Sequence, residues 1–493
     1  MTNGLKLIAR RTNRVDPLLV AAILATWIAL IPRLVPERSD DRGVFISVAA
    51  RLLAGDTLYS GVWDNKEPLF YYFVAGQVTL GRWSEVAAEA LLVAIAASAA
   101  FLLAVKLASR WTAMAISFIA VPIILTGEFY LPGYTELPGI ALTLVAITAS
   151  AYERPALAGF CIGLLIFTKL TYVPIVLLGV CCFSLTDGRF FDLVSIALGA
   201  SVSVALIVGV LFTRNELLPF VETIRLNIAY SQGNLIGSKK GFASLVEHLR
   251  RAGLGGWNLS AKLPILLGIM VALIMLSSKP GRNHTRIAIT ATCVLTFVGS
   301  LAVLSITGLW NQHSQILYIP TIITLISLSS LLDASVEVAR LRTLGLIFLI
   351  GLMMSGTLTL KEDFGAVRSF REAYAALDEV SPETRRLLAI GSSGTYARLG
   401  QNDDDRHAVG LSNWKLACPK FHQYPFFSAA VLNEVFECAS TVPVLIVSAE
   451  IAPEPDRPSW NEFVANVENL LAHNYSCDAN SGLRVCTRFP NRS

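Results

Sequence analysis

The sequence predicts a polytopic α-helical membrane protein of about eleven transmembrane helices, with a small extracytoplasmic α/β domain at its C-terminal end. Two observations predict the membrane part. Only 15% of the 493 residues are charged, against roughly 25% in an ordinary soluble domain, and the mean hydropathy is +0.58. Apolar runs of about 20 residues also recur, and each is long enough to cross a bilayer as one helix. These features exclude an ordinary soluble fold.

A third observation concerns the C-terminal end. Four of the eight cysteines lie in apolar segments, where they are expected to act as small hydrophobic side chains. The other four lie in a polar stretch, without the paired C-x-x-C spacing of a zinc site: Cys418, Cys438, Cys477 and Cys486. Because this number is even, as a disulfide framework requires, we expect the stretch to lie in an oxidising compartment.

The candidate spans follow from apolar windows read along the chain. They are Pro17 to Val35, Glu85 to Val105, Trp111 to Gly127, Pro138 to Tyr152, Pro155 to Thr171, Pro174 to Leu185, Phe191 to Phe212, Leu263 to Ser278, Ile287 to Thr307, Ile316 to Leu331 and Leu344 to Leu360. The stretch Leu69 to Leu80 is too short to span. We expect it to lie at the interface or to re-enter the helix bundle.

Basic residues set the expected orientation. Lys6, Arg10, Arg11 and Arg14 precede the first span without an A-x-A-like cleavage site, which predicts an anchored, cytoplasmic N-terminus in the plasma (inner) membrane. The short loops on that side then carry most of the Lys and Arg. Two long loops, 36–84 and 213–262, and everything after residue 360 fall outside, in agreement with the cysteines.

The segment 361–493 is predicted to be a separate α/β domain, following a membrane domain of residues 1–360. Apolar β-type runs at Leu387 to Ile390 and Val442 to Val447 alternate with amphipathic helical patterns around Phe370 to Leu377, Ala429 to Phe436 and Trp460 to Leu471. Cys477 and Cys486 flank a turn predicted between a helix and a strand. A bridge there would leave Cys418 to pair with Cys438, which is one of three possible connectivities.

The first outer loop carries the strongest candidate chemistry. After Asp40 and Asp41, apolar residues recur at helical spacing between Val44 and Leu53, so a short surface helix is expected there. Acidic groups are favourable at a helix N-terminus. The alternative interpretation is a simple helix cap at Asp40 or Asp41.

Short motifs in a fixed order resemble one family of membrane enzymes. The first outer loop reads D-x-G-V-F from Asp41, A-G-D-x-L-Y from Ala54 and W-D-x-K-x-P-L from Trp63. Later segments are Pro132 to Pro138, with a Thr-Glu element, Phe167-Thr168-Lys169, and Trp310 to His313 followed by Pro320. Together they resemble the GT-C glycosyltransferases that use polyprenyl-phosphate sugars, of the aminoarabinose transferase and protein O-mannosyltransferase type.

This resemblance implies an inverting sugar transfer on the outer face of the membrane. A nucleophile of the acceptor attacks the anomeric carbon and expels a lipid phosphate. Asp41, aligned through Gly43, Val44 and Phe45, would be the base or orient the acceptor, and Asp40 is the alternative because the chain reads D-D-R-G. Glu136 would be the second carboxylate. In some subfamilies such a pair holds a divalent cation; Asp41 and Glu136 could hold Mg or Mn, since oxygen ligands suit hard ions.

Expelling a phosphate requires positive charge. Lys66 and Lys169 are the first candidates for binding the donor phosphate, with Lys239, Lys240 and Arg225 as additional donors and His313 as a further contact. The alternative for Lys66 is snorkelling at the interface. For the lysine pair it is a solvated or lipid-facing charge, and for His313 a structural role.

The implied partners are a polyprenyl-phosphate sugar, a lipid, glycan or protein acceptor, and membrane lipids. A net charge of +4 without a long basic run excludes nucleic acid. The alternative functions are a transporter or flippase of a lipid-linked substrate and an inactive relative that serves as a scaffold. Charges at the outer ends of the spans, and the two longest loops on that side, favour surface chemistry over transport.

Overall fold

The computed structural model describes residues 16–30, 40–81, 83–107, 113, 133–186, 189–234, 284–306, 315–333, 387–399, 414–420, 423, 427–448, 451–455, 457–480 and 483–489. The chain divides into two compact units. The first comprises Met1–Pro36, Val86–Ala205 and Lys240–Arg371. The second comprises Glu37–Glu85, Leu206–Lys239 and Glu372–Ser493. The expected domain boundary at residue 360 lies outside the described residues.

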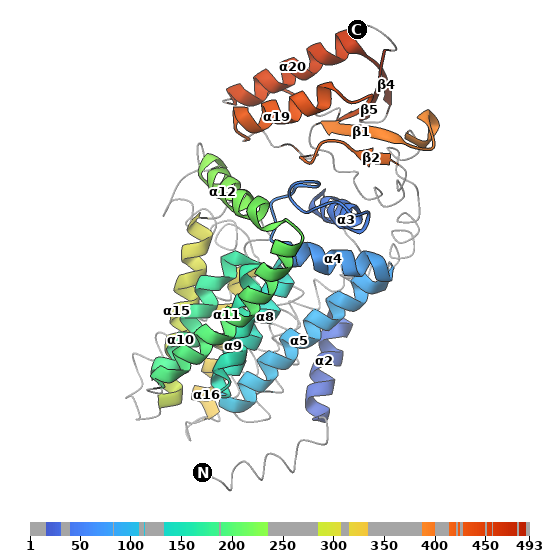
Figure 1. Ribbon diagram of the computed structural model, residues 1–493. Helices are drawn as coiled ribbons and strands as arrows, with labels where there is room; N and C mark the ends of the chain where they lie inside the picture. The colour runs from blue at the N-terminus through green and yellow to red at the C-terminus, as the bar shows by residue number, and fades with distance from the viewer. Residues whose placement is uncertain are drawn as a thin grey trace. The chain divides into compact units, whose positions relative to one another are not determined.

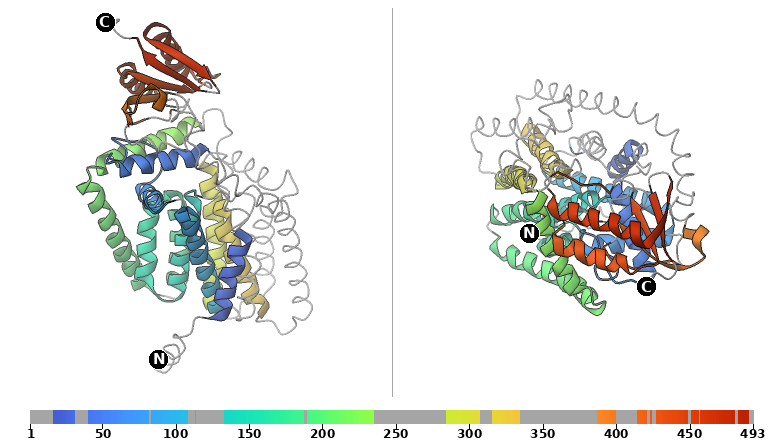
Figure 2. Two further views of the ribbon diagram at one scale, coloured as in Figure 1. Left: turned by 90° about the vertical axis from the view of Figure 1, so that its right-hand side faces the viewer. Right: turned by 90° about the horizontal axis from the view of Figure 1, so that it is seen from above.

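The first unit is helical. Its elements are α2 (Pro17–Leu30), most of α5 (Trp83–Leu107), α8 (Glu136–Ala151), α9 (Pro155–Ile166), the 3-10 turn η3 (Leu170–Tyr172), α10 (Val173–Thr186), most of α11 (Phe190–Thr213), α15 (His284–Ile306) and α16 (Tyr318–Asp333). Helix α10 runs beside α15, α15 packs against α16, and α8 packs against α9 (Figure 2). Their apolar side chains form one continuous core.

Two described helices are long and apolar enough to cross a membrane: Ser84–Lys106 and Phe190–Thr213. Shorter apolar helices occupy Glu136–Ala151, Pro155–Ile166, Leu170–Leu185, Ile289–Leu304 and Gln315–Ser327. All seven fall on spans expected from the sequence. The total of about eleven spans remains a prediction, because the segments expected at 111–127, 263–278 and 344–360 are outside the described residues, apart from residue 113.

Small residues bring α9 and α11 into close contact. A Cβ added at Gly159 would overlap the backbone carbonyl of Ile196, and one at Gly199 would overlap the carbonyl of Ala156. Gly163 lies one turn after Gly159 and faces Ser203 in the same way. Such small-residue contacts allow membrane helices to pack backbone against backbone.

Gly159→Ala is therefore expected to destabilise the first unit. The added methyl group has no space, and overpacking of this kind costs typically about 1–3 kcal/mol. Thermal unfolding of the purified protein in detergent measures the effect. Gly209→Ala on α11 is the matched control, since no heavy atom lies within 4 Å of its added Cβ. Equal midpoints for the two variants would contradict the close packing of α9 and α11.

The part of the second unit that precedes the C-terminal segment is built on α3 (Asp40–Leu53), α4 (Pro68–Leu80) and α12 (Leu217–Asn234). The helix expected after Asp41 is present, but it is not a surface helix, because most of its residues from Arg42 to Leu52 are buried. Helix α4 covers it: the Phe45 ring meets the rings of Phe70 and Tyr71 edge-on, at centroid distances of 5.0 and 6.2 Å. The stretch expected at Leu69 to Leu80 is α4.

The C-terminal part of the second unit is an α/β fold, as expected (Figure 1). Its five-stranded sheet has the order β2-β1-β3-β5-β4; β1, β2 and β3 are parallel, and β5 is antiparallel to both β3 and β4. The strands are β1 (Gly394–Leu399), β2 (Trp414–Leu416), β3 (Val444–Ser448), β4 (Tyr475–Asn480) and β5 (Leu483–Arg488). Helices α19 (Ala429–Ser440) and α20 (Pro458–Asn474) pack side by side.

Two details of this domain differ from the sequence expectation. The run Leu387 to Ile390 is helical, and the strand begins later, at Gly394. A four-residue apolar run does not distinguish the two states by periodicity, and only its first residue is buried. Cys477 and Cys486 lie on paired strands of the β4–β5 hairpin, not between a helix and a strand. The helical pattern around Phe370 to Leu377 lies outside the described residues.

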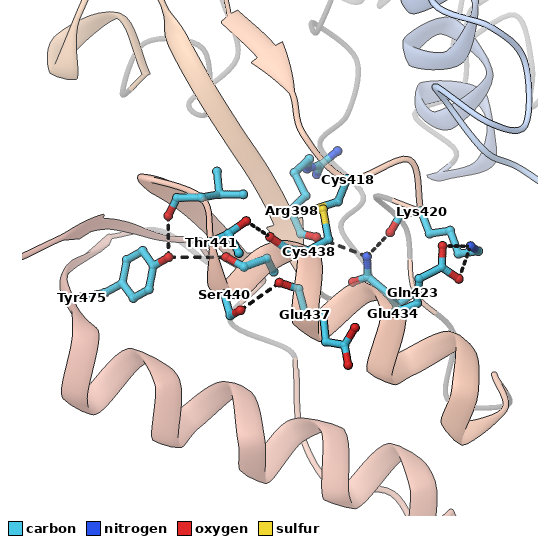
Figure 3. Close-up of a disulfide and its surroundings, with 12 residues drawn as sticks. Arg398, Cys418, Lys420, Gln423, Glu434, Glu437, Cys438, Ser440, Thr441 and Tyr475 are labelled. Carbon is cyan, nitrogen blue, oxygen red and sulfur yellow. Dashed lines mark hydrogen bonds and ion pairs between the residues drawn. A yellow bond between two sulfur atoms is a disulfide. The ribbon is translucent and has the colours of Figure 1, made fainter. Parts of the chain in front are cut away.

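Two disulfides tie this domain together: Cys477 to Cys486 across the hairpin, and Cys418 to Cys438 between the segment after β2 and α19. Figure 3 shows the second with its surroundings. The Gln423 side-chain amide donates to the carbonyl of Arg398, and Lys420 pairs with Glu434 on α19, with an Nζ–Oε1 distance of 2.6 Å. Gln423 is thereby bonded to β1 and Lys420 to α19.

Candidate active site

Asp40 and Asp41 are the first two residues of α3. Their side chains are outside the described part of the chain. The next residue, Arg42, is buried and forms an ion pair with Glu85 at the start of α5. This pair and the packing of Phe45 fix the first turn of α3. The backbone that carries both candidate bases is therefore held in place from two sides.

Lys66 lies on the loop between α3 and α4. Its ammonium is 5.8 Å from the centroid of the Phe45 ring, and its backbone carbonyl accepts a hydrogen bond of 2.8 Å from the Tyr59 hydroxyl. Asp64, which is buried, accepts a hydrogen bond from the Tyr71 hydroxyl. The candidate phosphate ligand Lys66 is thus brought to the same helix, α3, that begins with Asp40 and Asp41.

A second cluster lies in the first unit, at the start of α8. The Lys169 ammonium is 2.7 Å from Glu136 Oε1 and donates to the Thr135 hydroxyl, also at 2.7 Å. That hydroxyl donates in turn to Glu136 Oε2 at 3.2 Å. Only 2% of Glu136 and 8% of Lys169 is exposed. Because a buried charge needs a partner, the two candidates, far apart in the chain, form one closed pair.

Tyr172 belongs to this cluster, and sequence analysis did not identify it. Gly139 on α8 allows the close approach, since a Cβ there would lie 3.2 Å from the Tyr172 ring and 3.3 Å from Lys169 Cβ. The Tyr172 side chain is buried, and its hydroxyl has no hydrogen-bond partner among the described residues. A buried hydroxyl without a partner is costly, so this one is available to a bound ligand.

The cluster does not fit a divalent cation at Glu136. One carboxylate oxygen already faces the Lys169 ammonium and the other accepts from Thr135, so a metal ion would have to displace both or lie against a like charge. Within the described residues, no group of three or more His, Cys, Asp or Glu could hold a metal. No step below uses one.

Of the other phosphate candidates, the structure describes Arg225 alone. Arg225 is exposed on α12. Lys239, Lys240 and His313 lie outside the described residues.

Glu216 was missed by the sequence analysis. It is fully buried at the turn between α11 and α12 and accepts hydrogen bonds from the Leu58 N–H, the Tyr72 hydroxyl and Arg214 Nε. Burial, and then its bond to Glu216, raise the pKa of Tyr72 far above the usual value, so Tyr72 keeps its proton and donates. The sequence did contain a signal for it, because Glu216 is an ionisable residue just after the span expected at Phe191 to Phe212.

No family model and no curated protein matches this chain. Among solved structures, the chain is similar to the oligosaccharyltransferase AglB from Archaeoglobus fulgidus, solved with an inhibitory peptide and a dolichol-phosphate. The identity is 12% and the TM-score 0.49, over 96% of this chain and 74% of that one. It is also similar to the arabinofuranosyltransferase AftD from Mycobacteria, with 13% identity and a TM-score of 0.42, over 97% of this chain and 40% of that one. Similarities of this size identify neither a family nor an activity.

Proposed function

We propose that this protein is a membrane glycosyltransferase that moves a monosaccharide from a polyprenyl-phosphate donor to a lipid, glycan or protein acceptor on the outer face of the membrane. The ordered motifs of the sequence support this proposal, because they resemble those of GT-C enzymes. The cluster at the start of α8 supports it further, since two of these motifs, the Thr-Glu element and the lysine, meet there in a direct ion pair.

In the proposed reaction, Asp41 accepts the proton of the acceptor hydroxyl as the oxygen attacks the anomeric carbon. Asp40 is the alternative base. The bond between the anomeric carbon and the phosphate oxygen breaks, the configuration inverts, and the lipid phosphate leaves. Lys66 and Lys169 stabilise the negative charge that develops on the phosphate. Arg225, Lys239, Lys240 and His313 remain candidates for additional contacts.

The proposed contact of Lys169 with the phosphate rests on one observation. An ammonium group has three N–H donors, and among the described residues two have acceptors, Thr135 Oγ1 and Glu136 Oε1. The third is left for a phosphate oxygen. Glu136 is then a positioning residue: it pairs with the Lys169 ammonium and holds it in place within an apolar bundle, where an unpaired ammonium would be costly.

Tyr172→Phe tests whether the donor reaches this cluster. In the proposed complex the unpaired hydroxyl donates to the donor phosphate, so its loss should lower kcat/KM for the donor about tenfold, the equivalent of one hydrogen bond to a charged group. Stability should not fall, because the hydroxyl has no hydrogen-bond partner to lose among the described residues. Thermal unfolding and steady-state kinetics measure the two effects. Unchanged kinetics would exclude Tyr172 from the donor site.

The proposed function is tested by transfer of labelled sugar. Purified protein in detergent with native lipids and an acceptor extract is given a set of radiolabelled polyprenyl-phosphate sugars. Label is expected in the acceptor fraction with one donor, with release of polyprenyl phosphate. After reconstitution of the protein into vesicles, movement of intact donor across the bilayer without transfer would favour the transporter. Binding of donors without either process would favour the scaffold.

A further inference from the structure

One face of α12 is bonded to the loop that carries Lys66. Four residues make these contacts: Glu216, Phe220, Thr223 and Asn227. Glu216 immediately precedes α12, and its backbone carbonyl accepts the Phe220 N–H. These positions follow at spacings of four, three and four residues, so they lie on one stripe of the helix. Glu222 and Arg225, between them on the helix, are exposed. The loop therefore meets one face of α12, over about three turns.

Each contact on this stripe reaches a different point of the loop. Glu216 Oε1 accepts the Leu58 N–H at 3.1 Å, and the Phe220 ring lies 5.7 Å from that of Tyr59. Further on, the Trp63 indole donates to Thr223 Oγ1 at 3.1 Å and Asn227 donates to the Asn65 carbonyl at 2.7 Å. The last bonded loop residue is next to Lys66.

Glu216 is the charged residue of this stripe. It is 0% exposed, and of its three donors one comes from the loop, one from α4 and one from Arg214 beside it. It therefore links three segments through one carboxylate. A buried carboxylate needs such partners, and all three of them are donors, one a guanidinium.

The contacts between the loop and α12 also fix the backbone of Lys66. Tyr59, held by Phe220 and by its neighbour's bond to Glu216, adopts a left-handed backbone conformation with φ of 70°. A non-glycine residue keeps this conformation only where its surroundings fix it. In this geometry its hydroxyl reaches the Lys66 carbonyl at 2.8 Å, which fixes the backbone from which the lysine side chain extends toward Phe45.

We propose that Glu216 is a positioning residue for donor binding, which holds the loop from Leu58 to Lys66 on α12 and thereby places the Lys66 ammonium at the phosphate of the lipid-linked sugar. This inference rests on the proposed function. It assigns Glu216 no contact with the donor. It requires that loss of Glu216 act only through Lys66.

A double-mutant cycle tests this requirement. Glu216→Ala is expected to lower kcat/KM for the donor at least about tenfold, through loss of one ordered charge contact. The Lys66→Ala/Glu216→Ala double variant should be no less active than Lys66→Ala alone, because the two residues then share one contribution. Glu222→Ala, at an exposed position of the same helix, is the matched control and should retain wild-type kinetics.

Hydrogen exchange provides a readout independent of activity. The amides of residues 58–66 should exchange faster in Glu216→Ala than in wild type or Glu222→Ala. Glu216→Gln should lie between, because an amide oxygen still accepts from Leu58 while the charge is lost. Unchanged exchange in Glu216→Ala, or additive losses in the double variant, would overturn the inference. If wild-type protein transfers no sugar, the proposed function fails, and the exchange result alone decides whether Glu216 orders the loop.

Discussion

Asp41→Asn is expected to abolish sugar transfer while the protein remains folded. A positioned general base contributes typically about 10²–10⁴-fold to a rate, and an amide cannot take the acceptor's proton. Loss of one negative charge from the first turn of a helix costs only about 0.3–1 kcal/mol, so α3 should still form. Transfer of labelled sugar and thermal unfolding, measured on the same preparation, separate the two effects.

Two further variants make this experiment specific. Asp40→Asn changes the other aspartate at the start of α3 and should retain most of the activity; if it alone is inactive, Asp40 is the base. Asp192→Asn removes an acidic residue from the first turn of another helix, α11, and controls for the loss of charge at a helix start. Full activity of both Asp40→Asn and Asp41→Asn would exclude a base at this position.

Lys169→Met is expected to cause the largest loss of stability among these variants, together with loss of transfer. It leaves the Glu136 carboxylate, 2% exposed, without its counter-ion. Removing one partner of a buried ion pair costs about 3–5 kcal/mol. The midpoint of thermal unfolding in detergent should therefore fall clearly, and Glu136→Gln should reduce it in the same direction.

The double variant Lys169→Met/Glu136→Leu distinguishes stability from chemistry. Replacing a whole buried pair by apolar side chains is often neutral, so its stability should recover toward that of wild type, whereas transfer should remain absent. Glu434→Gln is the control for an exposed pair: Glu434 is 62% exposed in its bond to Lys420, and such pairs contribute about 0–1 kcal/mol. Transfer by the stabilised double variant would show that Lys169 does not act on the donor.

Long periodic or apolar segments allowed much of the fold to be predicted. Helices α19 and α20 and strand β3 lie where amphipathic or apolar patterns placed them, because each pattern repeats over several turns or fills a strand. The run Leu387 to Ile390 was assigned wrongly because four apolar residues carry no period. The burial of α3 was missed, because its sequence shows apolar residues at helical spacing but does not show that α4 packs over them.

The candidate site was likewise predictable only in part. Motif order and residue type selected Glu136 and Lys169 as candidates, but did not predict that they pair. The pairing depends on the close approach at Gly139, which is a property of the folded chain. Glu216 carries no motif. Its importance comes from three donors that converge on one carboxylate from different segments, and such convergence is not visible in the sequence.

Trp63 joins the loop between α3 and α4 to the C-terminal part of the second unit: its backbone N–H donates to the Pro419 carbonyl at 2.9 Å, and its ring meets that of Phe427 at a centroid distance of 5.5 Å. Pro419 follows Cys418, so the disulfide to Cys438 fixes the acceptor. During translation, the loop is synthesised long before residue 419. The loop's last contacts therefore form only after synthesis of the C-terminal segment, and contacts between such distant residues form slowly. Folding of this protein is thus expected to end, not begin, with the loop between α3 and α4.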